Sequence, residues 1–169
     1  MKKESILITG GAGNVGSSLV RALHLLEDYQ LTVIDNLSTG DFSKIDEFKD
    51  HINFYDCDVN NPEEIEKVFT ENKFSYVFHF AAVVGVKRTL QNPVNVLKDI
   101  SGFFNIFDLS VKNNIKRIFY ASSSEVYGEP IELPLKEEKT PLNTQLPYAK
   151  VKSIGESFCK SYYKEFNLP

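Results

Sequence analysis

Residues 5–23 read SILITGGAGNVGSSLVRAL and join an apolar run, a glycine-rich turn and a helical pattern. The run over residues 5–9 is typical of a short buried strand, and residues 14–27 carry the apolar spacing of a helix. Glycine recurs between them, as it does where a backbone has to turn tightly. The stretch therefore predicts a strand, a sharp turn and a helix at the start of an α/β domain.

The glycines of this turn fit two related spacings, Gly11-x-Gly13-x-x-Gly16 and Gly10-x-x-Gly13-x-x-Gly16. Either spacing alone is a weak signal, but here it follows a strand pattern and opens a helix pattern. Glycine lets the backbone come close to a pyrophosphate, and the N–H groups at the start of a helix attract its negative charge. The turn therefore favours dinucleotide binding.

A second buried strand pattern, residues 31–35, ends in the carboxylate of Asp35, 19 residues after Gly16. An acidic residue roughly 20 positions beyond the glycines accepts hydrogen bonds from an adenosine ribose in dinucleotide-binding proteins. A carboxylate there would also repel a 2′-phosphate, which favours NAD over NADP. The alternative is that Asp35 is only a strand-end cap or turn residue.

Composition is that of an ordinary globular protein, with 42% hydrophobic and 25% charged residues among 169. A net charge of −4 offers no basic patch, so we expect no nucleic-acid partner. Cys57 and Cys159 show neither metal-ligand nor disulfide spacing, and we expect no metal. No apolar stretch resembles a signal sequence or reaches membrane-spanning length, so we expect a cytoplasmic protein without a membrane partner.

Strand and helix patterns alternate along the chain, which predicts a parallel sheet with helices on both faces. We expect strands at residues 5–9, 31–35, 52–57, 75–81 and 117–122. We expect helices near residues 14–27, 62–72, 94–113 and 147–166. Residues 128–146 contain three prolines and predict a long loop just before the last helix.

Tyr148 and Lys152 lie four residues apart in the last predicted helix and therefore share one face of it. An ammonium beside a phenol favours the phenolate, so we expect the pKa of Tyr148 to be lowered from its usual value of roughly 10. Such a tyrosine can take a proton from an alcohol while a nicotinamide takes the hydride. The serine-rich stretch 122–128 at the end of the fifth strand would place hydroxyls in the same crevice. The simpler alternatives are a surface pair and a polar strand end.

Together these segments resemble the extended short-chain dehydrogenases/reductases, the nucleotide-sugar epimerase and dehydratase family. The matching motifs are Thr9-Gly10-x-x-Gly13-x-x-Gly16, Asp35-Asn36-Leu37-Ser38-Thr39-Gly40, Asp58-Val59, His79-Phe80-Ala81-Ala82, Ser122-Ser123-Ser124-Glu125-Val126-Tyr127-Gly128 and Tyr148-x-x-x-Lys152. The resemblance implies a Rossmann-type doubly wound parallel sheet, with residues 1–169 as the NAD-binding domain. It also implies that the family's C-terminal strands and substrate-binding part are absent.

Site roles follow from the resemblance position by position. It implies that Tyr148 is the catalytic base, that Lys152 holds the nicotinamide ribose and tunes Tyr148, and that Ser123 binds the reacting sugar oxygen. The remaining catalytic candidates are Ser124 and Glu125. The cofactor-binding candidates are Gly10, Gly13, Asn14, Val15, Gly16, Asp35, Asn36, Asp58, Val59, Ala81, Ala82, Tyr148 and Lys152.

The resemblance further implies that NAD removes hydride from C4 of a nucleotide-linked sugar to give a 4-keto intermediate. The run Tyr148-Ala-Lys-Val-Lys152 looks epimerase-like, whereas Glu125 as a further acid or base would suit a 4,6-dehydratase or decarboxylase. Ser124 stands where one dehydratase group has an aspartate. A non-catalytic NAD-binding module is the alternative from another class.

Two departures from the family pattern are visible. Asp99 stands where the family usually has an asparagine in the long helix, and a carboxylate cannot donate hydrogen bonds as an amide does. The family also runs to roughly twice this length, so we expect this chain to be an N-terminal fragment with the fifth strand as an exposed edge. The helices near 94–113 and 147–166 resemble those that pair in family homodimers, and the alternative is that their apolar positions cover the sheet.

Overall fold

The computed structural model describes residues 3–169 and contains one parallel sheet in the order β3-β2-β1-β4-β5. The strands are β1 Glu4–Thr9, β2 Tyr29–Asp35, β3 Ile52–Asp56, β4 Tyr76–His79 and β5 Arg117–Tyr120. Every adjacent pair of strands is parallel. Each strand is therefore joined to the next by a crossover connection rather than a hairpin.

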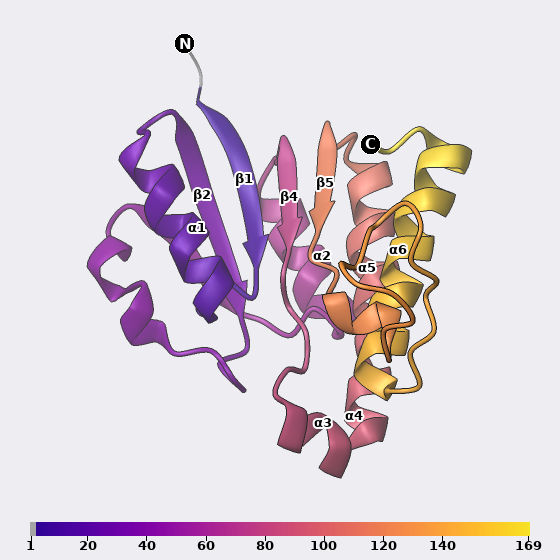
Figure 1. Cartoon of the computed structure of the whole chain (residues 1–169). Helices are drawn as coiled ribbons and strands as arrows, with labels where there is room; N and C mark the ends of the chain where they lie inside the picture. Colours follow the sequence, from indigo (N-terminus) through magenta and orange to yellow (C-terminus); the bar gives the residue numbers. More distant parts are fainter. Residues whose placement is uncertain (1–2) are drawn as a thin grey trace.

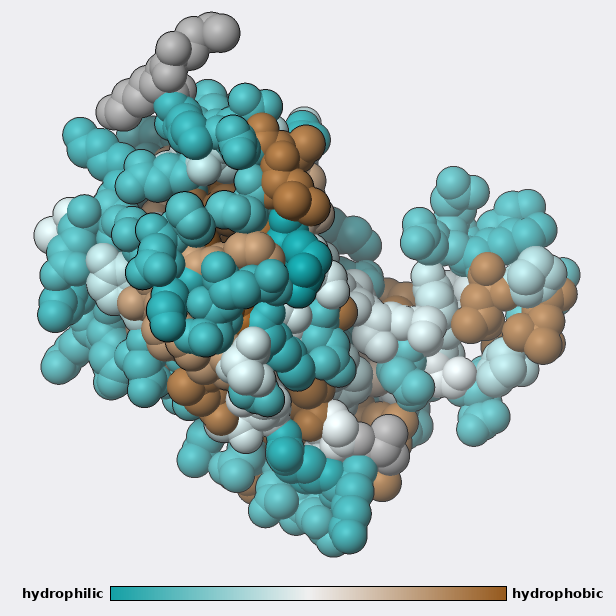
Figure 2. Space-filling view, turned by 90° about the vertical axis from the view of Figure 1, so that its left-hand side faces the viewer, coloured by the Kyte–Doolittle hydropathy of each residue, from teal (hydrophilic) through white to brown (hydrophobic). Residues whose placement is uncertain are grey.

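Helices cover both faces of the sheet (Figure 1). They are α1 Asn14–Leu25, α2 Pro62–Glu71, α3 Val86–Gln91, α4 Pro93–Leu97, α5 Asp99–Lys112 and α6 Pro147–Phe166. Helix α1 lies on one face with the short 3-10 turns Phe42–Lys44 and Asp46–Phe48, and α2, α5 and α6 lie on the other. The α1 side of the molecule is mostly hydrophilic where it meets solvent (Figure 2).

Two hydrophobic cores result from the alternation of side chains along each strand. In β1, Ile6 and Ile8 pack with Val20 of α1, whereas Leu7 between them packs with Phe103 and other residues of the α2, α5 and α6 layer. All three strand residues are at most 2% exposed. A strand that is apolar on both faces is what a sheet covered on both sides requires.

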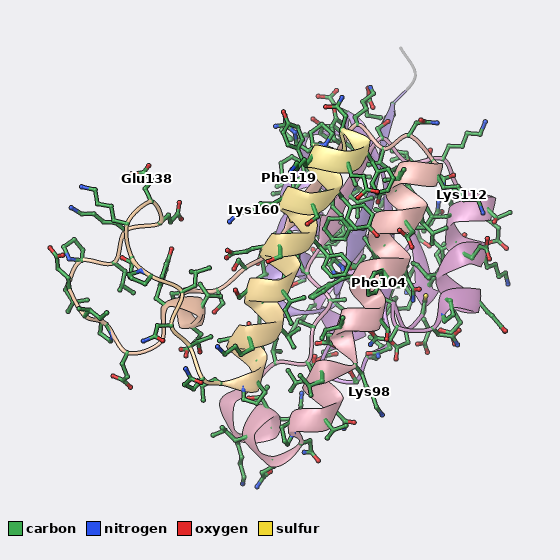
Figure 3. The ribbon with its side chains drawn as sticks, turned by 90° about the vertical axis from the view of Figure 1, so that its right-hand side faces the viewer. Lys98, Phe104, Lys112, Phe119, Glu138 and Lys160 are labelled. Atoms are coloured by element: carbon green, nitrogen blue, oxygen red, sulfur yellow. The ribbon has the colours of Figure 1, made fainter. Side chains whose placement is uncertain are left out.

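The expected fold class is confirmed, and so are the five strands, with ends shifted by a few residues. The single helix expected near 94–113 is wrong, because the chain forms α4 and α5 with Lys98 between them. The short helix α3 was not expected, and it starts directly after Gly85, whose φ of 104° few other residues adopt. Residues 128–146 contain no helix or strand and project from the body beside α6, with Glu138 far out on the loop (Figure 3).

The strand order creates a crevice at the carboxyl ends of β1 and β4. Strand β1 pairs with β2 on one side and with β4 on the other, so the connections that leave their carboxyl ends diverge to opposite sides. Ligands of open α/β sheets bind in such a crevice. Strand β5 forms one edge of the sheet, where Phe119 is 38% exposed and stacks on Phe78 with 4.4 Å between ring centroids. No described helix is long and apolar enough to cross a membrane.

Candidate active site

The glycine turn after β1 leaves no room for side chains. Gly10 has a φ of 67°, and a Cβ there would lie 2.7 Å from the Ala81 nitrogen. A Cβ on Gly16 would lie 2.3 Å from the Gly10 carbonyl oxygen. Helix α1 starts directly after Gly13, which supplies no side-chain cap. The first N–H groups of α1 are therefore available to an anion at the carboxyl end of β1.

Asp35 ends β2 beside this turn and is buried, at 8% exposure. Its Oδ2 atom accepts a hydrogen bond from the Ala12 nitrogen and its Oδ1 atom from the Leu37 nitrogen, each at 2.9 Å. An ionised carboxylate has about four acceptor positions, so each oxygen can accept a further bond. Asp35 thus fixes the turn and still offers acceptors to a diol.

A cavity of about 550 Å³ opens at these strand ends, within the size range of small-molecule sites. It is lined by every cofactor-binding residue predicted from the sequence except Tyr148 and Lys152, namely Gly10, Gly13, Asn14, Val15, Gly16, Asp35, Asn36, Asp58, Val59, Ala81 and Ala82. The far wall is made by Arg88 on α3, Asn92 between α3 and α4, Asn95 on α4 and Lys98 after α4, and of these the sequence pointed only to Arg88, as a possible phosphate contact. These four residues form no motif, and only the folding of α3 and α4 brings them to the cavity.

Thr9 at the end of β1 organises the strand beside it. Its hydroxyl lies 2.7 Å from Nδ1 of His79 and accepts from the backbone nitrogens of Phe80 and Ala81 at 3.1 and 3.0 Å. Burial, with the nearby charge of Lys152, lowers the pKa of His79 to about 3, so this imidazole is neutral. His79 is therefore a core residue that fixes the end of β4, although its Nε2 atom is buried without a hydrogen-bond partner.

Tyr148 and Lys152 lie in the first turns of α6, close to the residues that follow β5. Lys152 is 4% exposed, and its ammonium donates to the Ala121 carbonyl at 2.7 Å. The ammonium nitrogen lies 5.8 Å from the centre of the Tyr148 ring, and the Ser123 side chain is near enough to Tyr148 to lower the pKa of its phenol. The structure thus brings together the three residues predicted to act on an alcohol.

The expected acidic phenol is wrong for the protein alone. Burial raises the pKa of Tyr148, and the charges of Glu125 and Asp99 raise it further, while the nearby Ser123 side chain lowers it. Burial also lowers the pKa of Lys152 to about 8, against the attraction of Asp99. The ammonium donates to a carbonyl rather than to the phenol, so desolvation outweighs it at Tyr148.

The other two catalytic candidates lie in the 3-10 turn Ser124–Tyr127 that follows β5. Ser123 caps this turn by accepting from the Glu125 nitrogen at 3.2 Å. Ser124 and Glu125 are both exposed. Glu125 is close enough for its charge to act on Tyr148.

Comparison with known proteins fits this arrangement. Residues 6–169 match the model of the family described as "NAD dependent epimerase/dehydratase family". The chain belongs to this family. The expected family and its NAD cofactor are thereby confirmed.

The similar proteins include several sugar-nucleotide 4-epimerases. The chain is 32% identical to a putative UDP-arabinose 4-epimerase of Arabidopsis thaliana, over 96% of this chain and 38% of that protein. It is 32% identical to a UDP-glucose 4-epimerase of Cyamopsis tetragonoloba, over 97% of this chain and 49% of that protein. A solved Thermotoga maritima UDP-glucose 4-epimerase with UDP-glucose matches 97% of this chain and 52% of its own, with a TM-score of 0.89 and 29% identity.

A solved UDP-glucose 4-epimerase of Thermus thermophilus in complex with NAD matches with a TM-score of 0.88 and 29% identity, over 97% of this chain and 52% of its own. The chain therefore spans about half the length, or less, of the relatives it matches.

Proposed function

We propose that this chain is the NAD-binding half of a nucleotide-sugar 4-epimerase. The observation that carries the proposal is that a cofactor-sized cavity and a candidate catalytic group lie at the same end of the sheet, where the strands have their carboxyl ends. A cavity built on the glycine turn and Asp35 opens at the carboxyl ends of the strands, and Tyr148, Lys152 and Ser123 lie beyond β5 at the same edge. Relatives over this length include sugar-nucleotide 4-epimerases, which supports the same class of substrate.

The residues of the cavity fit NAD. The crowded glycine turn and the free start of α1 suit a pyrophosphate, and buried Asp35 suits a ribose diol. Asp58 and Val59 line the cavity after β3, where we place the adenine, and Ala81 and Ala82 form the wall after β4. Bound NAD supplies a hydride acceptor with a positively charged ring.

In the proposed reaction, Ser123 and Tyr148 hold the C4 hydroxyl of the sugar, and Tyr148 takes its proton as hydride leaves C4. Protonated Lys152 beside the phenol, together with the charged ring of the oxidised cofactor, offsets the burial that raises the pKa of Tyr148. The 4-keto sugar then rotates and presents its other face. Tyr148 returns the proton to the C4 oxygen as hydride is delivered to that face of C4.

A second candidate is a 4,6-dehydratase or decarboxylase of the same family. Glu125 favours this second candidate. Its charge raises the pKa of Tyr148, and it is exposed beside the site, where it could serve as a further acid or base. Loss of water or carbon dioxide from the sugar would identify this reaction. The remaining alternative is a binding module. In that case the chain would bind NAD, but the complete protein would convert no nucleotide sugar.

The deciding experiment uses the complete protein, with Tyr148→Phe as the test and Tyr163→Phe as its matched control. Both tyrosines lie in α6, but Tyr163 is 59% exposed. We expect Tyr148→Phe to lose epimerase turnover by a factor of about 100 or more while it still binds NAD in a titration. Wild-type-like turnover in Tyr148→Phe would refute the assignment of the base.

Two further expectations remain part of the proposal. Helices α5 and α6 lie side by side at the surface (Figure 3), and Phe104 and Phe166 expose 53% and 49% of their areas there. We place the interface of a homodimer on this face. Both cysteines are free thiols, the form that a reducing compartment such as the cytoplasm maintains.

A further inference from the structure

Three successive contacts join the end of β5 to α6. The Tyr120 hydroxyl donates to the Lys152 carbonyl at 3.3 Å, and the Lys152 ammonium donates back to the Ala121 carbonyl at 2.7 Å. The Ser122 hydroxyl donates to Oε1 of Glu156 at 2.5 Å. Three consecutive residues at the strand end are therefore bound to one stretch of α6, and Lys152 takes part in two of the contacts.

Gly155 lets the helix and the strand end approach this closely. It is a buried residue of α6, and a Cβ there would lie 2.7 Å from Cε1 of Tyr120 and closer still to its Cζ and hydroxyl oxygen. A carbon atom at that distance is well inside van der Waals contact, so either the ring or the helix would have to shift. The Tyr120 ring therefore occupies the space that a side chain at position 155 would need.

The Tyr120 ring is packed on its other neighbours as well. Phe103 of α5 is 2% exposed and lies edge-on to the ring, with 5.5 Å between ring centroids, and the ring of buried His79 lies 6.1 Å away. The Lys152 ammonium lies 5.0 Å from the ring centre, within the range of a cation–π contact. Because packed interiors leave few voids, a side chain at position 155 would push α6 away from β5, and Lys152 with it.

We propose that Tyr120 is a positioning residue, which fills the space left by Gly155 and sets the distance of α6 from β5 so that the Lys152 ammonium reaches the Ala121 carbonyl. The claim concerns the protein without cofactor. Its bearing on catalysis rests on the proposed function, in which Lys152 acts beside Tyr148. A helix displaced by the width of a methyl group would carry this ammonium away from its carbonyl and toward water.

The substitution Gly155→Ala tests whether the ring requires a glycine opposite it. Alanine in a helix interior ordinarily stabilises a protein relative to glycine. The fit against Tyr120 predicts the reverse, so Gly155→Ala should unfold at a lower urea concentration than the wild type. The control is Ser157→Ala at an exposed position of the same helix, which should unfold near the wild-type midpoint. An equal or higher midpoint in Gly155→Ala would overturn the proposal.

A second readout follows Lys152 itself, by an NMR titration of ¹³C-labelled lysine in the chain without cofactor. Burial lowers the pKa of this ammonium to about 8. Displacement toward water should therefore move its midpoint from about 8 toward 10.5 in Gly155→Ala and leave it unchanged in Ser157→Ala. A midpoint that stays at the wild-type value in Gly155→Ala would refute the positioning role. The titratable groups near Lys152 are the same in these proteins, namely His79 on β4, Tyr120 on β5, Asp99 on α5 and Tyr148 on α6.

A double variant separates the fit from general damage and serves where Gly155→Ala does not fold. Tyr120→Leu removes the ring atoms that a Cβ at position 155 would meet. In that background we expect Gly155→Ala to lower the urea midpoint less than it does in the wild type, or not at all. Equal losses in the two backgrounds, or a double variant that fails to fold while Tyr120→Leu folds, would contradict the proposal. None of these measurements requires turnover of a sugar nucleotide, so failure of the proposed function is seen separately.

Discussion

Lys152 should make the stability of this chain depend on pH in a way that can be isolated by substitution. Burial lowers its pKa from 10.5 to about 8, and the side chain is 4% exposed. At about 1.4 kcal/mol per pKa unit, keeping this ammonium in the folded state costs about 3 kcal/mol below pH 8. The unfolded chain binds the proton more tightly, so this cost fades and stability rises as pH increases from 8 to 10.5.

The substitution Lys152→Met removes the charge and keeps an unbranched stem. It also leaves the Ala121 carbonyl without its donor, which costs about 1–3 kcal/mol at any pH. We therefore expect the difference in unfolding free energy, variant minus wild type, to fall by about 2 kcal/mol between pH 7 and pH 10. The pH-independent loss shifts both values equally and does not affect this change.

Urea unfolding followed by circular dichroism at pH 7, 8, 9 and 10 measures this difference. The matched control is Lys160→Met, which lies at an exposed position of the same helix (Figure 3). The control should follow the wild type at every pH. If Lys152→Met and the wild type keep a constant difference from pH 7 to 10, the lysine is not a buried cation and the reasoning fails.

Three other substitutions test the turn, the carboxylate and a helix start. Gly16→Ala forces a Cβ to 2.3 Å from the Gly10 carbonyl, so unfolding in urea should show a loss of about 1–3 kcal/mol, and an unchanged midpoint would contradict it. Asp35→Asn removes the charge that disfavours a 2′-phosphate, so the Kd ratio of NADP to NAD should fall; an unaltered ratio argues against this role. Asn61→Ala removes the cap of α2 and should cost about 1 kcal/mol in the same assay, a value near zero being inconsistent with the cap.

The turn, the sheet and most of the cavity could be predicted from the sequence because local rules fix them. Glycine at positions 10 and 16 is required by contacts within a few residues or with the adjacent strand end. The two-faced strand β1 and the carboxylate after β2 follow from short apolar runs. These local patterns also place the site, because the carboxyl ends of parallel strands lie at one edge of the sheet.

The rest depended on tertiary structure. The break at Lys98 and the helix after Gly85 involve short segments without a strong period, so the pattern predicted one helix near residues 94–113 and none at residues 86–91. The pKa of Tyr148 depends on its burial and on where the Lys152 ammonium points, and neither is visible in a spacing of four residues. Asp99 could be identified as unusual, but its contact with the Val83 nitrogen could not.

The most direct test of the central claim is a crystal structure of this chain grown with NAD. We expect the pyrophosphate at the start of α1, the adenosine ribose on Asp35, and the nicotinamide ring beside Tyr148 and Lys152. NAD bound elsewhere, or a nicotinamide ring directed away from Tyr148, would contradict it.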